Sequence, residues 1–131
     1  SSLIGLWESK SYNTPNENEG RSRNTEIEVS KYTGYRSKLI MLINKTGIVV
    51  INENRIRIEN DKEISYTDVT FSQKCELVEV NYPYYTLVAI EGKNLGRKMV
   101  FKYIPESGII DWENYLSLGF IQKPEDFKKI D

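Results

Sequence analysis

The chain has 131 residues, a length that fits one domain over residues 1–131 with a core that needs no metal or disulfide to fold. Its formal net charge of −1 argues against a nucleic-acid-binding protein, and no apolar run approaches the roughly 20 residues of a transmembrane segment. It has no histidine, which removes the commonest general base and the usual zinc ligand, so we expect no catalytic residues, no metal and no cofactor.

The first predicted strand begins at "GLW", where a glycine and one of the two tryptophans stand two positions apart. Alternation along a strand places Gly5 and Trp7 on the same face. A glycine beside a large ring lets a neighbouring segment approach, and we expect the indole to plug one end of the interior. The next stretch, Asn13–Thr25, contains no large apolar residue and predicts a long surface loop.

Short β-like runs follow, separated by turn residues. The apolar runs at residues 38–43 and 48–51 are joined by "NKTG", in which Gly47 supplies the positive φ of a tight hairpin turn. In "EISYTDVTFS" the apolar positions change face near Thr67–Asp68, which predicts a β-bulge. Other strand candidates lie at residues 26–32, 55–59, 76–82, 84–91, 97–104 and 109–116. Their short connections are typical of an antiparallel meander.

The last stretch, "KPEDFKKID", predicts a short C-terminal helix. Pro124 suits the first helical position, acidic residues follow it and lysines come later, which complements the helix dipole. Phe127 and Ile130, three positions apart, would dock this helix on the rest of the domain.

A sheet of so many strands without covering helices must bury one face on itself, by closing into a barrel or by folding into a sandwich. The pair Gly5-x-Trp7 on the first strand resembles the start of the lipocalin and fatty-acid-binding (calycin) superfamily, and bacterial lipocalin-like domains are the closest fit. This resemblance implies an all-β fold, an antiparallel up-and-down β-barrel of about 8–10 strands with one open mouth. It also implies that the Asn13–Thr25 loop forms part of a lid.

Such a barrel predicts a non-enzymatic binding protein that holds a small hydrophobic ligand. Strand alternation selects the residues expected to line its cavity: Ile40, Leu42, Val78, Val80, Tyr82, Met99, Phe101 and Tyr103. A register error of one residue would turn a whole strand to the opposite face.

A second hypothesis keeps the fold but fills its interior with side chains. The chain would then act through its surface as a protein-interaction module, such as an inhibitor, an immunity factor or a cell-surface accessory protein. Exposed tyrosines and the Asn13–Thr25 loop would form the recognition face. An enzyme is the third hypothesis and rests on Asp111 and Glu113, which lie about 6–7 Å apart on one face of a strand. A polar outer face, with Trp112 pointing inward, is the favoured interpretation of that pair.

A cationic end of the barrel could hold a carboxylate ligand. We nevertheless interpret the basic residues as solvated faces and edges of the sheet, which protect against aggregation. They are Arg55, Arg57, Arg97, Lys98 and Lys102.

Cys75 is the one cysteine, so no intrachain disulfide forms, and we interpret it as a small buried apolar residue. The chain starts at "SSLIG" without a methionine, so we expect that a leader or a tag has been removed. A secreted or periplasmic location is therefore favoured over the cytoplasm, which the lone cysteine would also suit.

Overall fold

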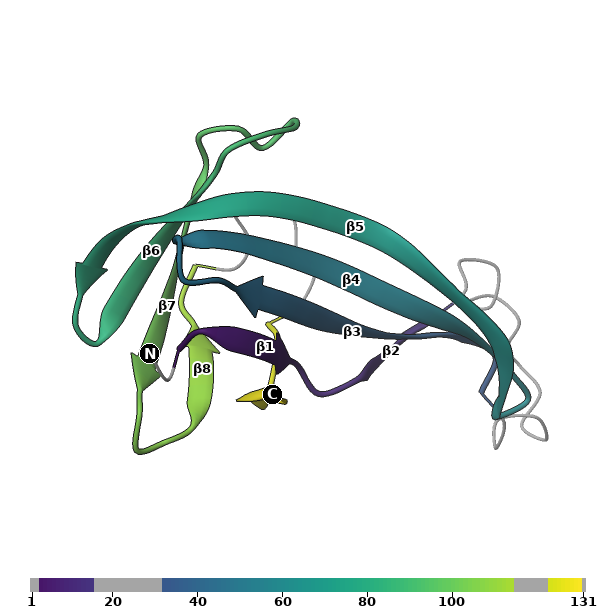
Figure 1. Cartoon of the computed structure of the whole chain (residues 1–131). Helices are drawn as coiled ribbons and strands as arrows, with labels where there is room; N and C mark the ends of the chain where they lie inside the picture. The colour runs from purple at the N-terminus through teal and green to yellow at the C-terminus, as the bar shows by residue number, and fades with distance from the viewer. Residues whose placement is uncertain (1–2, 16–31, 115–122, 131) are drawn as a thin grey trace.

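A computed structural model of the chain describes residues 3–15, 32–114 and 123–130 and gives an all-β protein (Figure 1). Within those ranges there is no helix with the length and apolar character to cross a membrane. The strands are β1 (Gly5–Glu8), β2 (Tyr12–Pro15), β3 (Gly34–Ile43), β4 (Ile48–Glu59), β5 (Lys62–Asn81), β6 (Tyr84–Ala89), β7 (Lys98–Ile104), β8 (Ile109–Trp112) and β9 (Phe127–Lys129).

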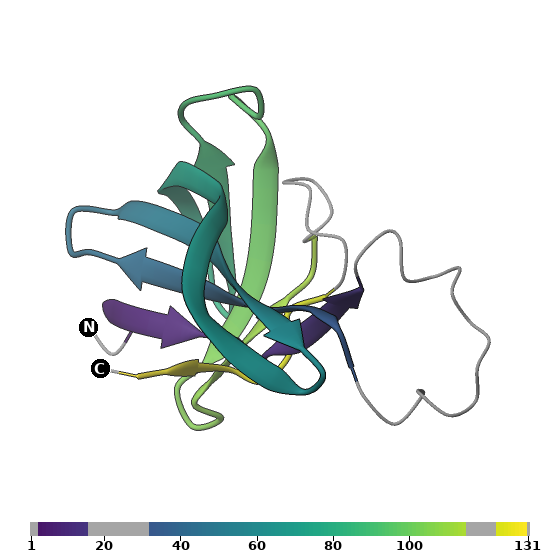
Figure 2. The same ribbon diagram turned by 90° about the vertical axis from the view of Figure 1, so that its right-hand side faces the viewer.

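The strands close into a ring. From β3 to β9 each strand pairs antiparallel with the next along the chain, and β1 pairs with both β9 and β3. Figure 2 shows β1 and β9 side by side. Since β2 pairs with the far half of β3, β1 and β2 form one interrupted strand of the wall. The predicted fold class is confirmed: this is a closed antiparallel β-barrel of eight strands in up-and-down order.

Alternate side chains along each strand point into the interior. In β7 the side chains of Met99, Phe101 and Tyr103 are buried, whereas Lys98 and Lys102 point to the opposite face. Because successive side chains of a strand point to opposite faces, closing the sheet turns one face of every strand into the core. The core consists of Trp7, Leu39, Met41, Ile43, Val49, Ile51, Cys75, Leu87, Ala89, Met99, Phe101, Tyr103, Ile110, Trp112 and Phe127.

The strands β3, β4 and β5 are the long ones, and they run past the ring toward the end where β2 lies (Figure 1). The register between β4 and β5 shifts between Glu53 and Asn54 and again between Ile56 and Ile58. Bulges of this kind bend a strand pair and increase its twist. The bulge predicted near Thr67–Asp68 belongs to this pair, and the two observed shifts lie on either side of those residues.

The predicted C-terminal helix is wrong within residues 123–130. Phe127–Lys129 form β9, in which Phe127 pairs with Ile110 of β8 and is fully buried. Ile130, expected to dock a helix, is 46% exposed. A local preference for helix is weak compared with the burial of an aromatic ring and the sheet pairing that it accompanies.

The predicted loop at Asn13–Thr25 is also wrong in its first part. Residues 13–15 belong to β2, where Asn13 pairs with Arg36 of β3. Residues 16–25 of that loop, and most of the strand predicted at 26–32, lie outside the described residues.

Candidate binding site

Trp7 lies on the inner face at the end of the barrel that carries the β3–β4 and β7–β8 turns. It is 1% exposed, and its indole N–H donates a hydrogen bond of 2.9 Å to the carbonyl of Leu3. Its ring meets Tyr103 edge to face, with ring centroids 5.5 Å apart. Gly5 has φ = 142°, a backbone conformation that favours glycine, and this residue brings the chain into β1.

Further aromatic rings continue from Trp7 across the interior. Phe101 stacks on Tyr85 at 5.3 Å and meets Trp112 edge to face at 5.2 Å, and Trp112 in turn meets Phe127 at 5.6 Å. Offset and edge-to-face pairs at these separations stabilise one another beyond their apolar area. We call this set the aromatic floor: Trp7, Tyr85, Phe101, Tyr103, Trp112 and Phe127.

The cavity-lining residues predicted on β7 lie inside. Met99, Phe101 and Tyr103 are all buried in the core. The two predicted on β3 lie on the other face, because the buried side chains there are Leu39, Met41 and Ile43. Leu42 is accordingly 46% exposed and Ile40 is half-buried, so their inward assignment is wrong.

Although the register sets Val80 opposite Tyr85 of the aromatic floor, the interior does not enclose Val78, Val80 or Tyr82, which were predicted to line a cavity. Their side chains are 49%, 57% and 60% exposed. The register of β5 against β6 shifts between Leu77 and Glu79, which takes Val78 out of the alternation. Val80 and Tyr82 lie beyond this shift, at the tip of the β5–β6 hairpin.

A different feature occupies the inner face at the far end of β3. Tyr35 pairs with Arg57 of β4, and Ser37 pairs with Arg55. These positions share the face of buried Leu39, because they are two and four residues from it along β3. Tyr35 is six residues from Met41, the partner of Trp7, which corresponds to about 20 Å along an extended strand.

The two arginines share one aromatic ring. The guanidinium carbon of Arg55 lies 4.1 Å from the ring centroid of Tyr35, and that of Arg57 lies 5.1 Å from it. Both distances are within the range of cation–π attraction. Arg57 also forms an ion pair of 3.5 Å with Glu59, and its side chain is 25% exposed. We call Tyr35, Arg55 and Arg57 the cationic end; its two arginines, interpreted from the sequence as part of a solvated face or edge, are partly exposed and lie on the face of Leu39.

The neighbouring carboxylate, Glu53, is engaged on both oxygens. The hydroxyl of Tyr12 donates to one oxygen, and the hydroxyl of Thr70 donates to the other at 2.6 Å. Burial, together with the hydrogen bond to Glu53 and its negative charge, raises the pKa of Tyr12. The hydroxyl therefore stays protonated and holds the Glu53 carboxylate in place beside the arginines.

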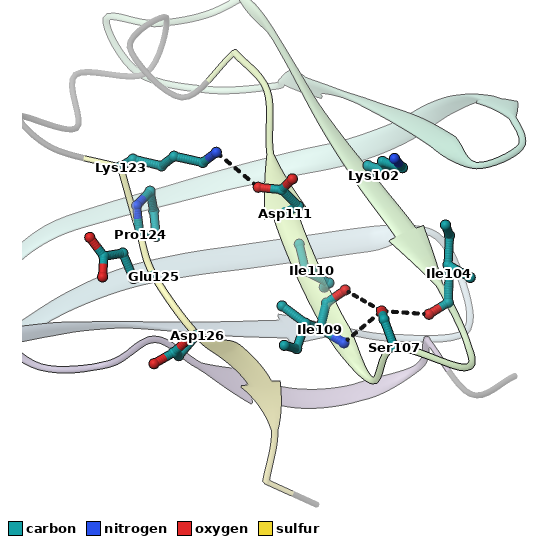
Figure 3. Close-up of a pocket in the computed structure, with 10 residues that line it drawn as sticks. All are labelled: Lys102, Ile104, Ser107, Ile109, Ile110, Asp111, Lys123, Pro124, Glu125 and Asp126. Carbon is teal, nitrogen blue, oxygen red and sulfur yellow. Dashed lines mark hydrogen bonds and ion pairs between the residues drawn. The ribbon is translucent and has the colours of Figure 1, made fainter.

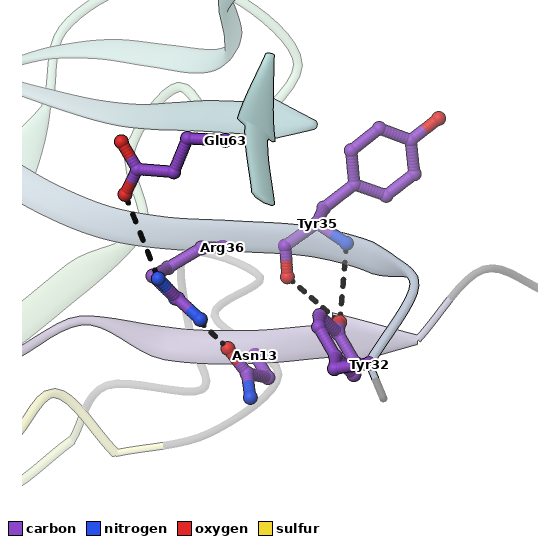
Figure 4. Close-up of polar contacts among 5 residues, drawn as sticks. All are labelled: Asn13, Tyr32, Tyr35, Arg36 and Glu63. Atoms are coloured by element: carbon purple, nitrogen blue, oxygen red, sulfur yellow. Dashed lines mark hydrogen bonds and ion pairs between the residues drawn. The ribbon is translucent and has the colours of Figure 1, made fainter. Parts of the chain in front are cut away.

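Polar contacts brace the strands around the cationic end (Figure 4). The hydroxyl of Tyr32 donates to the carbonyl of Tyr35 at 2.8 Å and accepts its N–H at 3.1 Å. Arg36 on the opposite face donates to Asn13 of β2 at 3.2 Å and pairs with Glu63 of β5 at 3.5 Å. These contacts tie β2, β3 and β5 together and fix the backbone that carries Tyr35.

Asp111 and Glu113 are not brought together with other catalytic groups. Asp111 forms an ion pair with Lys123 on the outer surface, and Glu113 is exposed. Cys75 is fully buried, and burial raises the pKa of its thiol to about 12, which makes it a poor nucleophile at neutral pH. Among the described ranges, no group of three or more cysteine, aspartate or glutamate side chains could hold a metal ion.

Comparisons of the chain with protein-family models, with curated proteins and with solved structures find no match.

Proposed function

We propose that this chain is a lipocalin-like binding protein that holds a small hydrophobic ligand with an anionic group at one end. One observation carries the proposal, namely the contrast along the inner face of a closed barrel. At one end this face presents the aromatic floor, and about 20 Å away it presents two arginines around one tyrosine ring. The up-and-down ring and the Gly5-x-Trp7 start are the features shared with the lipocalin-like class.

The chemistry of the two ends suits the two parts of such a ligand. Apolar carbon gains from leaving water against aromatic rings, at about 25 cal/mol per Å² of buried apolar surface. A guanidinium group binds carboxylate, sulfate or phosphate through a planar fork of N–H donors. Stacking on Tyr35 restricts the side chains of both arginines, so less conformational freedom is lost when they bind an anion.

Two fluorescent dyes with the same carbon skeleton test the proposal. Phenylnaphthylamine is uncharged, and anilinonaphthalene sulfonate adds one sulfonate to that skeleton. We expect saturable binding of both, with the sulfonate bound about tenfold more tightly at low salt and less so at high salt. If neither dye binds saturably, the proposed function is refuted. If both dyes bind with equal affinity, only the preference for an anionic ligand is refuted.

The second candidate is a protein-interaction module, and one specific observation favours it. The tip of the β5–β6 hairpin exposes four large apolar side chains within seven residues: Val78, Val80, Tyr82 and Tyr84. Tyrosines on an exposed apolar surface are frequent anchors of protein interfaces. A stoichiometric partner that co-purifies from the native cells and is lost in Tyr82→Ser/Tyr84→Ser, but not in Leu95→Ser, would favour this function. Deletion of Asn13–Thr25 asks separately whether that segment takes part.

A further inference from the structure

The wall of the barrel has long ladders at most of its seams and short ones at the two seams that flank β9. Strand β3 pairs with β4 along its whole length, from Gly34 to Ile43. Between β8 and β9 the ladder has only two residue pairs, Ile109 with Lys128 and Ile110 with Phe127. The ladder between β1 and β9 also has two residue pairs, but there the backbone N–H of Ile130 donates a further hydrogen bond of 2.8 Å to the carbonyl of Leu6. Among the described residues, the seam between β8 and β9 therefore has the least backbone pairing to break.

Beyond that short ladder, the chain before β9 is bonded to a different neighbour. The carbonyl of Glu125 accepts a hydrogen bond of 2.7 Å from the backbone N–H of Lys10, on the connection between β1 and β2. On the side of β8, the ammonium group of Lys123 lies 2.9 Å from the carboxylate of Asp111. Both side chains are about half exposed, and an ion pair so open to water contributes little to stability.

A pocket of about 590 Å³ lies at this seam (Figure 3). Apolar side chains of Ile104 and Ile109 form part of its lining, and so do the buried residues Ile110 and Pro124. Ile110 pairs with Phe127, whose ring touches Trp112 of the aromatic floor. An apolar molecule in this pocket is thus separated from the floor by a single layer of side chains.

We propose that the seam between β8 and β9 is the route by which an apolar ligand enters the barrel, with the ion pair Lys123–Asp111 as its latch. The inference rests on the proposed function, since a route needs a ligand to use it. Among the described residues, opening here breaks the exposed ion pair Lys123–Asp111 and a ladder of two residue pairs, whereas opening at β3–β4 would break a ladder of ten residue pairs. The apolar part of a lining that also carries charged side chains offers the ligand a contact before the seam opens.

The test links the seam covalently and measures the rate of uptake. The variant Asp111→Cys/Lys123→Cys is bridged with a short bis-methanethiosulfonate reagent, which a reductant removes. Cys75 is fully buried and is left in place. Binding of phenylnaphthylamine is followed by stopped-flow fluorescence before linking, after linking and after reduction.

A matched control links a different seam. Lys38 and Glu8 form an ion pair of 2.9 Å between β3 and β1, with comparable exposure, where the strands pair along the whole of β1. The variant Glu8→Cys/Lys38→Cys is bridged with the same reagent. Its uptake rate reports any general effect of linking two strands of the barrel.

We expect the bridge between positions 111 and 123 to slow uptake about tenfold, reduction to restore the rate, and the control bridge to leave it unchanged. An unchanged rate in the bridged seam variant would overturn the route, and so would equal slowing by both bridges. If the unmodified protein binds neither phenylnaphthylamine nor anilinonaphthalene sulfonate, the proposed function fails and the route fails with it. If the dye binds saturably but the bridge between positions 111 and 123 leaves the uptake rate unchanged, the route is wrong while the proposed function stands.

Discussion

The two ends of the inner face are built on different physical principles. At the Trp7 end, large rings exclude water and contact one another, and the indole N–H is satisfied by a backbone carbonyl. At the cationic end, charged and hydroxyl groups satisfy one another in pairs, as in Tyr12 with Glu53 and Arg57 with Glu59. The comparison shows one barrel in which aromatic packing and charged groups are concentrated at opposite ends.

The expected magnitudes explain this division. Burying a large side chain contributes several kcal/mol, and its removal leaves a cavity in addition. A partly exposed ion pair or cation–π contact contributes about 1 kcal/mol or less. The aromatic floor therefore dominates the free energy of unfolding, whereas the cationic end can change with little effect on the fold.

The largest expected effect comes from Trp7→Ala. This change removes a fully buried indole, its contact with Tyr103 and its hydrogen bond to Leu3. We expect a loss of about 3–5 kcal/mol in the free energy of unfolding, measured by urea denaturation. Trp7→Phe keeps a ring but loses the N–H donor, and should lose less. A loss below about 1 kcal/mol in Trp7→Ala would mean that the floor does not anchor the barrel.

The pH dependence of the free energy of unfolding tests whether the interior around Cys75 excludes water. Burial raises the pKa of Cys75 from 9.0 to about 12, so the folded protein keeps the thiol proton above pH 9 while the unfolded chain loses it. The stability due to this group is complete below pH 9 and is lost as pH rises toward 12. Between about pH 8 and 10.5, Cys75→Ala should therefore lose about 2 kcal/mol less than the unmodified chain in urea titrations. Equal losses of stability in both proteins would show that the Cys75 thiol is not shielded from water.

Binding should respond most strongly at the opposite end. The double variant Arg55→Met/Arg57→Met keeps the apolar stems of both side chains but removes both charges. We expect the affinity for anilinonaphthalene sulfonate to fall about tenfold while that for phenylnaphthylamine stays unchanged, measured by fluorescence titration. Lys98→Met/Lys102→Met, on the outer face of β7, serves as the charge-matched control. A similar loss in the control would contradict a specific anion site.

The smallest expected effect comes from Tyr12→Phe. The variant loses the hydrogen bond to Glu53 but keeps the one from Thr70 to the same carboxylate. We expect a loss of about 1 kcal/mol at neutral pH by urea denaturation. Because the folded pKa of Tyr12 is raised, its stabilising contribution declines above the ordinary tyrosine value, and the two proteins should converge in alkali. If the free energies of unfolding of Tyr12→Phe and the unmodified protein differ by a constant amount up to strongly alkaline pH, this explanation is contradicted.

The closed sheet could be predicted from the sequence because the strand signals are frequent and the alternation in β7 is clear. Which side chains of β3 point inward could not be predicted, since "KLIMLI" is a continuous apolar run without alternation. In β5 the alternation was clear but misleading, because a register shift after Leu77 changes which side chains point inward. A shift of one residue carries no reliable sequence signal.

The cationic end was hidden by a similar ambiguity. In "RIRIE" the isoleucines suggest the inner face, yet pairing with β3 places Arg55 and Arg57 on the face of Leu39. Ile58 on the opposite face is also fully buried, so both faces of β4 are covered there and polarity does not distinguish them. The C-terminal strand was missed for a different reason, because its pairing with β8 and β1 depends on residues far away in the sequence.

That long-range pairing has a kinetic consequence. The ring is complete only when Trp7 lies opposite Lys129, two residues at nearly opposite ends of the chain. Contacts between such distant residues raise the contact order, and chains of high contact order fold slowly. The β4–β5 hairpin can form early from local contacts, whereas closure of the ring must wait for both termini. Trp7 sits at this junction, so the burial of its indole should be among the last events of folding.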